Sequence, residues 1–366
     1  MLKRTEAYAI PVADLSPELA GQWLALTEVA ADCASPLMHP AYAQTVGKVR
    51  PGVEVAVITQ DGEAVGFLPF ERMPGGIGRS IGARLCDRSG AVVRPGVEWS
   101  VEAVARAAGL RMLRLANVSL DDGAFRPYVT GKAIAPYMDL TDGYEAYRLA
   151  NIRAGSGNMK RVDRRSRKLE GMLGPLRVVW NDTHDGVLDT LLRWKAKQRQ
   201  ATRSPNVFDL PWARHLLACL RLPRSGDFGG VMTTLYAGET LCAAHFGVRS
   251  RRVLHYWLAA YDEEMGRCSP GLLLLMRMAS EAASRGIERL DLGPGDEEYK
   301  VHISSGHQDV ATATACTGPA MTSLVRAAEG VRLRARESRA LRVTRRTLIR
   351  GAYFVRSSFG SGRARA

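Results

Sequence analysis

Residues 253–300 read VLHYWLAAYDEEMGRCSPGLLLLMRMASEAASRGIERLDLGPGDEEYK, and this stretch decides the fold. Its first eight residues are rich in aromatic and β-prone side chains, which is typical of a buried strand. Ser269-Pro270-Gly271 then marks a helix start, because serine can cap free amides and proline suits the first helical position. Apolar residues follow at helical spacing, and residues 287–292 predict a second strand. A strand, a crossover helix and a parallel strand place a ligand site at the strands' carboxyl ends.

The surrounding sequence predicts a mixed α/β protein. Residues 231–236 and 240–248 form a hairpin pattern that leads into the stretch above, and residues 310–315 add a closing strand. An earlier hairpin pattern lies within residues 53–70, where Gln60-Asp61-Gly62-Glu63 makes a tight turn. We therefore expect two lobes, each with a mixed and mostly antiparallel sheet flanked by helices.

Composition excludes several classes of protein. A chain of 366 residues exceeds a typical single domain, and 46% hydrophobic residues is ordinary for a globular protein. No apolar run approaches the roughly 18 residues of a membrane span, and Met1–Asp14 lacks the apolar core of an export signal. The six cysteines and seven histidines show no metal-ligand spacing. The sequence thus predicts a cytoplasmic protein with reduced thiols and no metal site.

The positive charge is concentrated at the C-terminus. From Met321 onward there are twelve arginines and two glutamates, which account for ten of the fourteen net positive charges. Apolar residues among these arginines predict a basic amphipathic helix, and such a helix can lie on an anionic membrane surface. RNA ranks below the membrane because regular aromatic interleaving is missing. A solvated helix remains an equal alternative.

A second basic segment, residues 148–170, is also predicted to be helical. Its arginines and lysines clearly outnumber Asp163 and Glu170. It is either a solvated connection between domains or a positive wall beside the active cleft that suits a phosphorylated ligand. We place the domain boundaries so that residues 1–145 form the first lobe, 146–318 the second lobe and 319–366 the basic tail.

The order of elements from residue 185 onward resembles the GNAT acyltransferase fold. Five short motifs carry a closer resemblance: His255-Tyr256-Trp257-Leu258, Tyr261-Asp262, Ser269-Pro270-Gly271-Leu272-Leu273-Leu274, Asp291-Leu292-Gly293-Pro294-Gly295 and Tyr299-Lys300. In these motifs the sequence resembles the CelD-like acetyltransferases of polysaccharide biosynthesis most closely, and residues 86–90 (Cys-Asp-Arg-Ser-Gly) are similar to that family's first lobe. The Fem-type peptidyltransferases, which pair two GNAT lobes, are also similar.

The resemblance implies transfer of an acetyl or other acyl group from acyl-CoA to an amine or hydroxyl of a small-molecule or glycan-precursor acceptor. A helix N-terminus is a natural anchor for the donor's pyrophosphate. The family's usual anchor is Q/R-x-x-G-x-G/A, but here a proline replaces the first motif glycine and removes one amide donor. The expected donor-binding residues are Arg267, Ser269, Pro270, Gly271 and Leu272.

Several side chains are candidates to move the acceptor's proton. Asp291 lies within an apolar strand, where an unpaired carboxylate is costly, so it must be paired or near the cleft, and it is the preferred acid or base. His255 and Tyr256 alternate in direction, so only one of them can line the cleft. Asp262 at the strand's exit is the fourth candidate. For substrate binding we expect Trp257, Tyr299 and Lys300.

Two further functions stay open at this point. A Fem-type transferase that uses aminoacyl-tRNA fits the altered turn and the basic tail, although the second lobe lacks the heptads of a coiled-coil insertion. A non-catalytic GNAT-like component of a biosynthetic complex is the other alternative. The acceptor, the acyl chain length and the oligomeric state do not follow from the sequence.

Overall fold

The computed structural model describes residues 5–29, 34–154, 157–202, 205–222 and 226–318, together with residues 322, 323 and 325. The basic tail predicted from residue 319 onward therefore lies almost wholly outside the described residues. Across the described part, no helix is both long enough and apolar enough to cross a bilayer.

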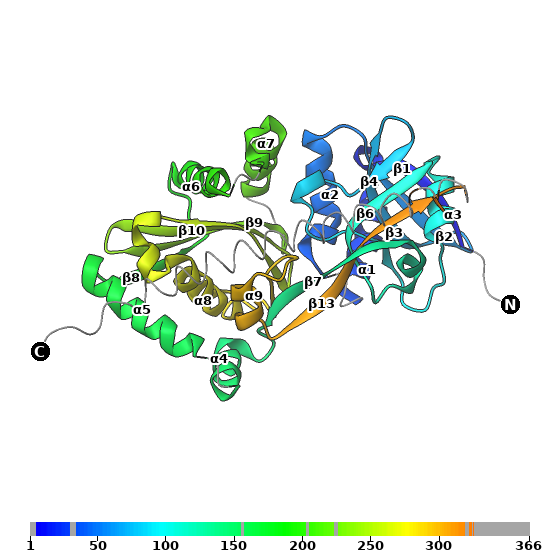
Figure 1. The fold of residues 1–366 in the computed structure, drawn as a ribbon. Coiled ribbons are helices and arrows are strands. Elements are labelled where there is room, and N and C mark those ends of the chain that lie inside the picture. The colour runs from blue at the N-terminus through cyan, green and yellow to red at the C-terminus, as the bar shows by residue number, and fades with distance from the viewer. Residues whose placement is uncertain are drawn as a thin grey trace, which may run out of the picture. The chain divides into compact units, whose positions relative to one another are not determined.

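The strands of the described chain form one mixed and mostly antiparallel sheet, ordered β1-β2-β3-β4-β6-β13-β7-β12-β11-β10-β9-β8, with β5 paired to β3 (Figure 1). The neighbours β4/β6 and β11/β12 run parallel. The strands are β1 (Thr5–Pro11), β2 (Val53–Gln60), β3 (Glu63–Met73), β4 (Ile77–Arg79), β5 (Val92–Val93), β6 (Met112–Ser119), β7 (Val129–Asp139), β8 (Leu176–Trp180), β9 (Gly229–Ala237), β10 (Thr240–Arg249), β11 (Val253–Tyr261), β12 (Arg289–Asp291) and β13 (Gly306–Cys316).

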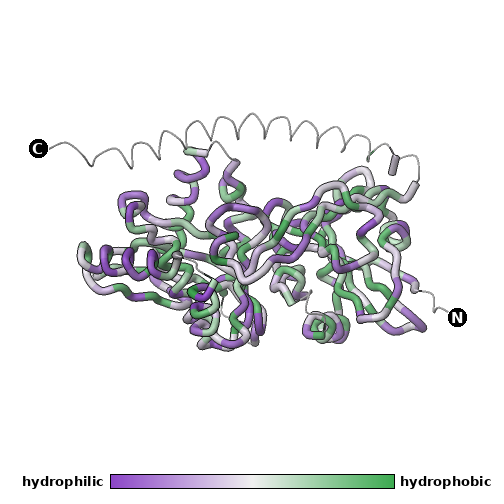
Figure 2. The backbone as a smooth tube through the Cα atoms, turned by 60° about the horizontal axis from the view of Figure 1, so that its bottom comes forward, coloured by the Kyte–Doolittle hydropathy of each residue, from purple (hydrophilic) through white to green (hydrophobic). Residues whose placement is uncertain are grey.

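Helices cover both faces of this sheet, and they bury its apolar side chains. Figure 2 shows hydrophobic stretches along the interior strands and hydrophilic stretches on the surrounding helices and turns. The α-helices are α1 (Pro17–Val29), α2 (Pro40–Val49), α3 (Val101–Ala107), α4 (Gly143–Arg153), α5 (Asn158–Leu173), α6 (Val187–Ala201), α7 (Pro211–Arg221), α8 (Pro270–Ala283) and α9 (Glu298–Ile303).

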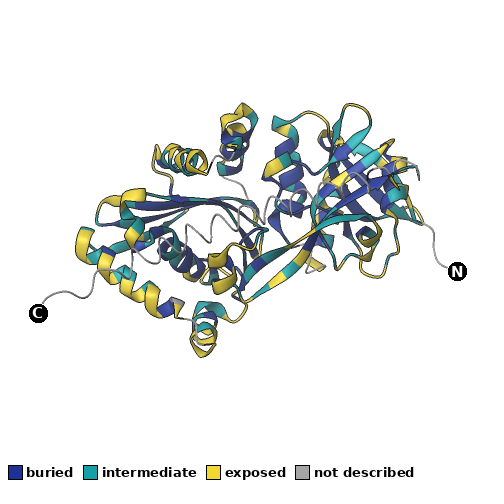
Figure 3. Cartoon of the chain, in the orientation of Figure 1, coloured by how far each residue is buried: buried dark blue, intermediate teal, exposed yellow. Residues whose placement is uncertain are grey.

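In the second half of the chain, α8 lies on one face of strands β8–β11, and α6 and α7 lie on the other (Figure 1). Leu254 and Leu275 belong to the core on the α8 side. Leu216 and Phe246 belong to the core on the α7 side. The helix α5 packs beside α8 and against β8 and β9, and Figure 3 shows exposed residues along it. This layering places α5 and α6 on opposite faces of the same sheet.

The two halves of the sequence share strands. The strand β13 comes from the second half, yet it pairs with both β6 and β7 of the first half. In turn β12 pairs antiparallel with β7. The boundary that we place at residue 145 stays a prediction, and the sheet crosses it three times.

The structure differs from the expected elements in two places near the cleft. The single basic helix expected over residues 148–170 is two helices, α4 and α5, and Gly157 directly before α5 is a residue that disfavours helix. The segment after Gly293-Pro294-Gly295 is not an open loop, since Tyr299 and Lys300 lie on the short helix α9.

Candidate active site

A cleft of about 1310 Å³ opens along the strand β11, and we refer to it as the β11 cleft. It is bounded by α5, α6, the start of α8 and the segment 292–303. Its charged and aromatic lining residues are Asp87, Arg161, Arg165, Lys195, Arg199, Tyr256, Trp257, Tyr261, Glu297, Glu298, Tyr299, Lys300 and His302.

The cleft exists because the strand β12 pairs with only the first part of β11. On one side β10 pairs with β11 from Leu254 to Tyr261. On the other side β12 pairs with it only from Val253 to His255. Because backbone groups alternate in direction along a strand, the part after His255 presents N–H and C=O groups to the cleft. These are the groups that can polarise a carbonyl bound there.

A bulge changes the direction of the side chains at this point. The register between β10 and β11 shifts between Phe246 and Val248, so that Tyr256 and Trp257 both lie opposite Gly247. Both residues line the cleft, although Tyr256 packs against the core on the α8 side and Trp257 against the core on the α7 side. Only glycine fits at position 247, since a Cβ there would lie 2.4 Å from the carbonyl oxygen of His255. Bulges are frequent beside active sites because they redirect side chains in this way.

The start of α8 forms one end of the cleft. Ser269 lies in the left-handed region (φ 49°, ψ 55°), and its side chain makes no capping hydrogen bond. The expected serine cap is therefore wrong, because this backbone conformation turns the hydroxyl away from the helix amides. Pro270 occupies the first turn as expected and is buried. The amides of Leu272 and Leu273 donate to the carbonyl of Ser269, at 3.0 and 3.2 Å.

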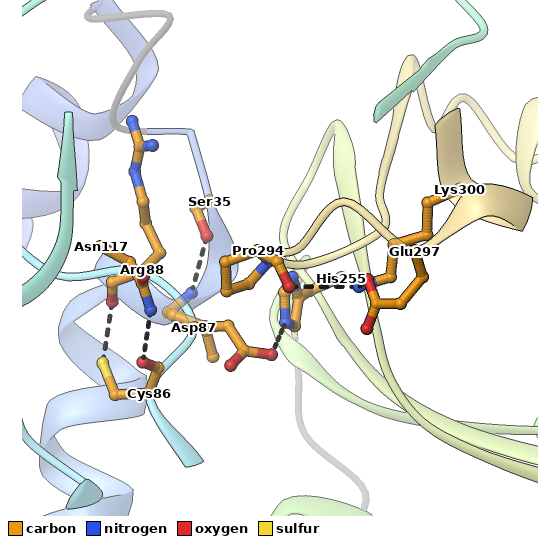
Figure 4. Close-up of polar contacts among 10 residues, drawn as sticks. Ser35, Cys86, Asp87, Arg88, Asn117, His255, Pro294, Glu297 and Lys300 are labelled. Atoms are coloured by element: carbon orange, nitrogen blue, oxygen red, sulfur yellow. Dashed lines mark hydrogen bonds and ion pairs between the residues drawn. The ribbon is translucent and has the colours of Figure 1, made fainter. Parts of the chain in front are cut away.

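Asp87, from the first half of the chain, meets His255 at the other end of the cleft (Figure 4). The Asp87 Oδ2 atom lies 3.1 Å from Nε2 of His255. The histidine side chain is 2% exposed and the carboxylate 28% exposed. The histidine thus holds a carboxylate that faces the cleft. Such a carboxylate is suited to accept a proton from an acceptor amine or hydroxyl.

The buried ring of His245 packs against Tyr256. The ring of His245 on β10 stacks on the ring of Tyr256, with centroids 4.6 Å apart and planes 5° apart. Neither ring nitrogen of His245 has a hydrogen-bond partner among the described residues. Burial, together with the nearby His255, lowers the pKa of His245 to about 3. Burial also raises the pKa of the Tyr256 hydroxyl well above its ordinary value. Both groups are therefore neutral at pH 7.

The segment after β12 closes the cleft through Lys300. Its Nζ donates to the carbonyl of Pro294 at 3.2 Å and pairs with Oε2 of Glu297 at 2.9 Å (Figure 4). The Lys300 side chain is 8% exposed. A buried ammonium that is bonded twice within its own segment fixes the conformation of that segment.

Most of the residues expected for donor and substrate binding do line the cleft, and so does the proton-transfer candidate Tyr256. The binding residues in the lining are Trp257, Ser269, Gly271, Leu272, Tyr299 and Lys300. His255 reaches the cleft only through Asp87, and Pro270 is buried in the core beside it. Arg267 is exposed and lies outside the lining.

Asp262 and Asp291 need correction as acid or base candidates, because neither lines the cleft. Asp262 accepts a hydrogen bond from the amide of Glu264 at 3.0 Å and so caps the short 3-10 helix Glu263–Cys268. Asp291 accepts from Nε of Arg289 at 2.6 Å. The expectation that Asp291 is either paired or near the cleft is met by this pair, and the geometry gives no support to a role in proton transfer.

The sequence did not single out Asp87 or Lys195 as site residues. Lys195 on α6 donates from Nζ to the carbonyl of Ala259 on β11 at 3.0 Å. Burial, with further contributions from Arg199 and Lys300, lowers its pKa to about 8. Asp87 lies 168 positions from His255 in the chain, so no local pattern could pair them. Within the described residues, no cluster of three or more His, Cys, Asp or Glu side chains could hold a metal ion.

Comparison with known proteins is consistent with this geometry. The family model of the acetyltransferase (GNAT) domain matches residues 156–301, which contain β11, α8 and most of the cleft lining. The solved structure of FemX is 11% identical, covers 84% of this chain and 98% of its own, and has a TM-score of 0.59. No curated protein matches the sequence.

Two more solved structures have lower structural similarity. A tandem GNAT protein from the clavulanic acid biosynthesis pathway is 14% identical, covering 86% of this chain and 99% of its own, with a TM-score of 0.48. The C-terminal domain of a putative lysylphosphatidylglycerol synthetase from Agrobacterium fabrum is 12% identical, covering 84% and 94%, also at 0.48. The family match over residues 156–301 and the FemX similarity over most of the chain show a GNAT fold.

Proposed function

We propose that this protein transfers an acetyl or other acyl group from acyl-CoA to an amine or hydroxyl acceptor. One observation carries the proposal: the open side of β11 and the N-terminus of α8 face the same cleft, within the segment that matches the GNAT domain. The first supplies amides for a thioester carbonyl and the second supplies a positive helix end for phosphate. Both requirements of acyl transfer from a thioester meet in one place.

The proton of the acceptor would leave through Asp87. As the amine or hydroxyl attacks the thioester carbon, its proton passes to the Asp87 carboxylate, either directly or through one water. The tetrahedral oxygen is held by β11 amides until the C–S bond breaks, and the leaving thiolate then takes the proton from the Asp87 carboxyl group, directly or through one water. His255 acts as a positioning residue, because its Nε2 contacts Asp87 and its ring is buried away from the substrate.

The acceptor class is a finer part of the proposal. The resemblance to CelD-like acetyltransferases of polysaccharide biosynthesis favours an amino sugar or another cell-envelope precursor. The basic tail would then serve at an anionic membrane surface, with a cytoplasmic or peripheral location. The motif resemblance supports the acceptor class, and the arginine-rich sequence from residue 321 onward supports the membrane location.

An acyl-transfer assay tests the proposal. The full chain is incubated with acetyl-CoA and a panel of amino sugars, polyols and nucleotide sugars, and free thiol is measured. Thiol release that depends on one acceptor class supports the proposal. If no acceptor releases thiol and coenzyme A does not bind, the proposal fails.

The second candidate is a Fem-type transfer from aminoacyl-tRNA, which the similarity to FemX favours. The described part of the second half contains no helix longer than the 16 residues of α5, so the coiled-coil insertion expected of that class is absent from the described residues. Tight binding of coenzyme A argues against this candidate. Transfer from a charged tRNA in its place would establish it.

A further inference from the structure

Four basic side chains converge on the β11 cleft from two helices, and we call them the cation cluster. Arg161 and Arg165 lie on α5, and Lys195 and Arg199 lie on α6. Each pair is spaced by four residues, so its two members share one face of their helix. Since α5 and α6 cover opposite faces of the sheet, they reach a common space only where β11 has lost β12 as a neighbour.

The charge of the cation cluster is not neutralised by the protein. Among the described residues, no carboxylate forms an ion pair with any of the four. Two of the three acids in the lining have other partners, Asp87 with His255 and Glu297 with Lys300. The third acid, Glu298, forms no ion pair with a cluster cation among the described residues. The cations also disfavour one another: burial first, and then Arg161 and Arg164, lower the pKa of Arg165.

On the side of α6 that faces away from the cleft, the lysine side chain does have an acidic partner. Lys197, two positions from Lys195, pairs with Glu263 at 2.8 Å. The protein thus supplies a carboxylate for the lysine that faces away from the cleft and none for the cation cluster. Uncompensated like charges around a cleft create a potential that favours a bound polyanion.

The start of α8 explains why such cations are needed. Pro270 has no amide, and the amides of Leu272 and Leu273 already donate to the Ser269 carbonyl. Of these first four residues, only Gly271 has an amide left for a phosphate. The helix α5 packs against both α8 and the turn before it, and Arg165 lines the same cleft as Ser269 and Gly271. Guanidinium groups at this position can replace the missing amide donors.

We propose that the cation cluster binds the phosphate groups of the donor, with Arg161 and Arg165 as the principal contacts beside the start of α8. The inference rests on the proposed function and deepens it: the donor is a phosphorylated nucleotide thioester, bound as much by charge as by helix amides. Coenzyme A has this chemistry, because it carries both a pyrophosphate and a 3′-phosphate.

Calorimetric titration of the full chain tests the cluster. The ligands are coenzyme A, dephospho-coenzyme A, pantetheine and adenosine 3′,5′-bisphosphate. The test variant is Arg161→Gln with Arg165→Gln. The matched control is Arg164→Gln with Lys197→Gln, which removes the same charge from outside the cleft lining.

The test variant should weaken binding of coenzyme A by about tenfold or more, because two charge-assisted contacts are lost. Pantetheine binding should stay unchanged, and the control should stay within about threefold of the parent, because its charges are exposed and screened. Equal losses in test and control, or equal losses for coenzyme A and pantetheine, would overturn the cluster as a phosphate site.

The two proposals can fail separately. Binding of adenosine 3′,5′-bisphosphate through the cluster, without binding of coenzyme A or thiol release, keeps the phosphate site and rejects the acyltransferase. Transfer activity with no loss in the test variant keeps the acyltransferase and rejects the phosphate site. If the parent chain binds neither phosphorylated ligand, the phosphate site is rejected.

Discussion

At the scale of single residues, the proposed chemistry depends on Asp87 rather than on Asp291. Asp87 faces the cleft and is held by the buried ring of His255. Asp291 is held by Arg289 outside the cleft lining. The two aspartates thus have different partners, and only Asp87 lines the cleft where a substrate can bind.

The first prediction compares these two aspartates. Asp87→Asn should lower kcat about 100-fold or more, since the proton acceptor is lost, with little change in thermal stability. Asp291→Asn should keep most of the activity, since its partner is Arg289. Steady-state kinetics on both variants measures the difference. Full activity of the Asp87 variant together with an inactive Asp291 variant would restore the assignment made from the sequence.

The second prediction concerns the buried His245. Its pKa is lowered to about 3 by burial, so the folded state resists a proton that the unfolded state binds near its ordinary pKa of about 6.5. Stability is therefore lost as the pH falls below that value, by up to about 1.4 kcal/mol per pH unit from this group.

His245→Phe keeps the stacked ring on Tyr256 and removes the titrating group. Urea unfolding between pH 4.5 and 7.5 should show a shallower loss of stability in this variant than in the parent chain. Parallel curves for the two proteins would contradict a buried neutral histidine.

The sequence could predict the site residues that lie in one continuous stretch, but not those that folding brings together from distant parts of the chain. The sequence could predict Tyr256, Trp257, Gly271, Tyr299 and Lys300 as candidates because they belong to one continuous stretch with strong local patterns, and all five line the cleft. Asp87 could not be found, because its pairing with His255 is created by folding and leaves no spacing signal. The cost of a buried carboxylate correctly required a partner for Asp291, but it could not say which partner.

At the scale of elements, the bulge between β10 and β11 organises the cleft. Gly247 lets the two strands approach, and Tyr256 and Trp257 both lie opposite it. Strict alternation would place Leu254 and Leu258 on one face of the sheet, but Leu254 lies in the core on the α8 side and Leu258 in the core on the α7 side. A bulge interrupts the alternation of side chains along a strand, and the sequence of β11 contains no pattern that predicts one.

The third prediction tests this bulge. Gly247→Ala would bring a methyl group to 2.4 Å from the His255 carbonyl oxygen, so the strands must separate. We expect a loss of stability of about 1–3 kcal/mol and a lower kcat. Gly229→Ala on β9 is the matched control, since no atom lies within 4 Å of its added Cβ. If both variants unfold at the same urea concentration, the bulge is not constrained as described.

At the scale of the whole molecule, the lobes are not independent in sequence. The strand β13 completes a sheet whose other members, β6 and β7, come from the first half. Its residues Ala311, Ala313 and Ala315 lie in the core of that half. Local patterns predicted the strands on each side of residue 145, but long-range pairing decides how they join.

The fourth prediction follows from this shared sheet. A fragment of residues 146–318 should fail to fold cooperatively, because β13 has no partner strands there. Co-expression with residues 1–145 should recover a soluble complex, and residues 1–317 should fold as the positive control, because they keep every described strand. Thermal unfolding followed by circular dichroism measures this. A cooperative transition in the isolated second fragment would contradict the account.

The fifth prediction concerns donor binding at the start of α8. Gly271→Asp puts a carboxylate in the lining beside Tyr261 and should abolish binding of coenzyme A. Gly266→Asp is the matched control, because its added Cβ meets no atom within 4 Å and it lies outside the lining. It should bind like the parent chain, provided that both variants melt as the parent does.

Calorimetric titration of the parent chain with coenzyme A tests the central claim most directly. We predict saturable binding of one molecule per chain, lost in the Gly271 variant and kept in the Gly266 variant. Absence of binding at millimolar coenzyme A would contradict an acyl-CoA site in the β11 cleft.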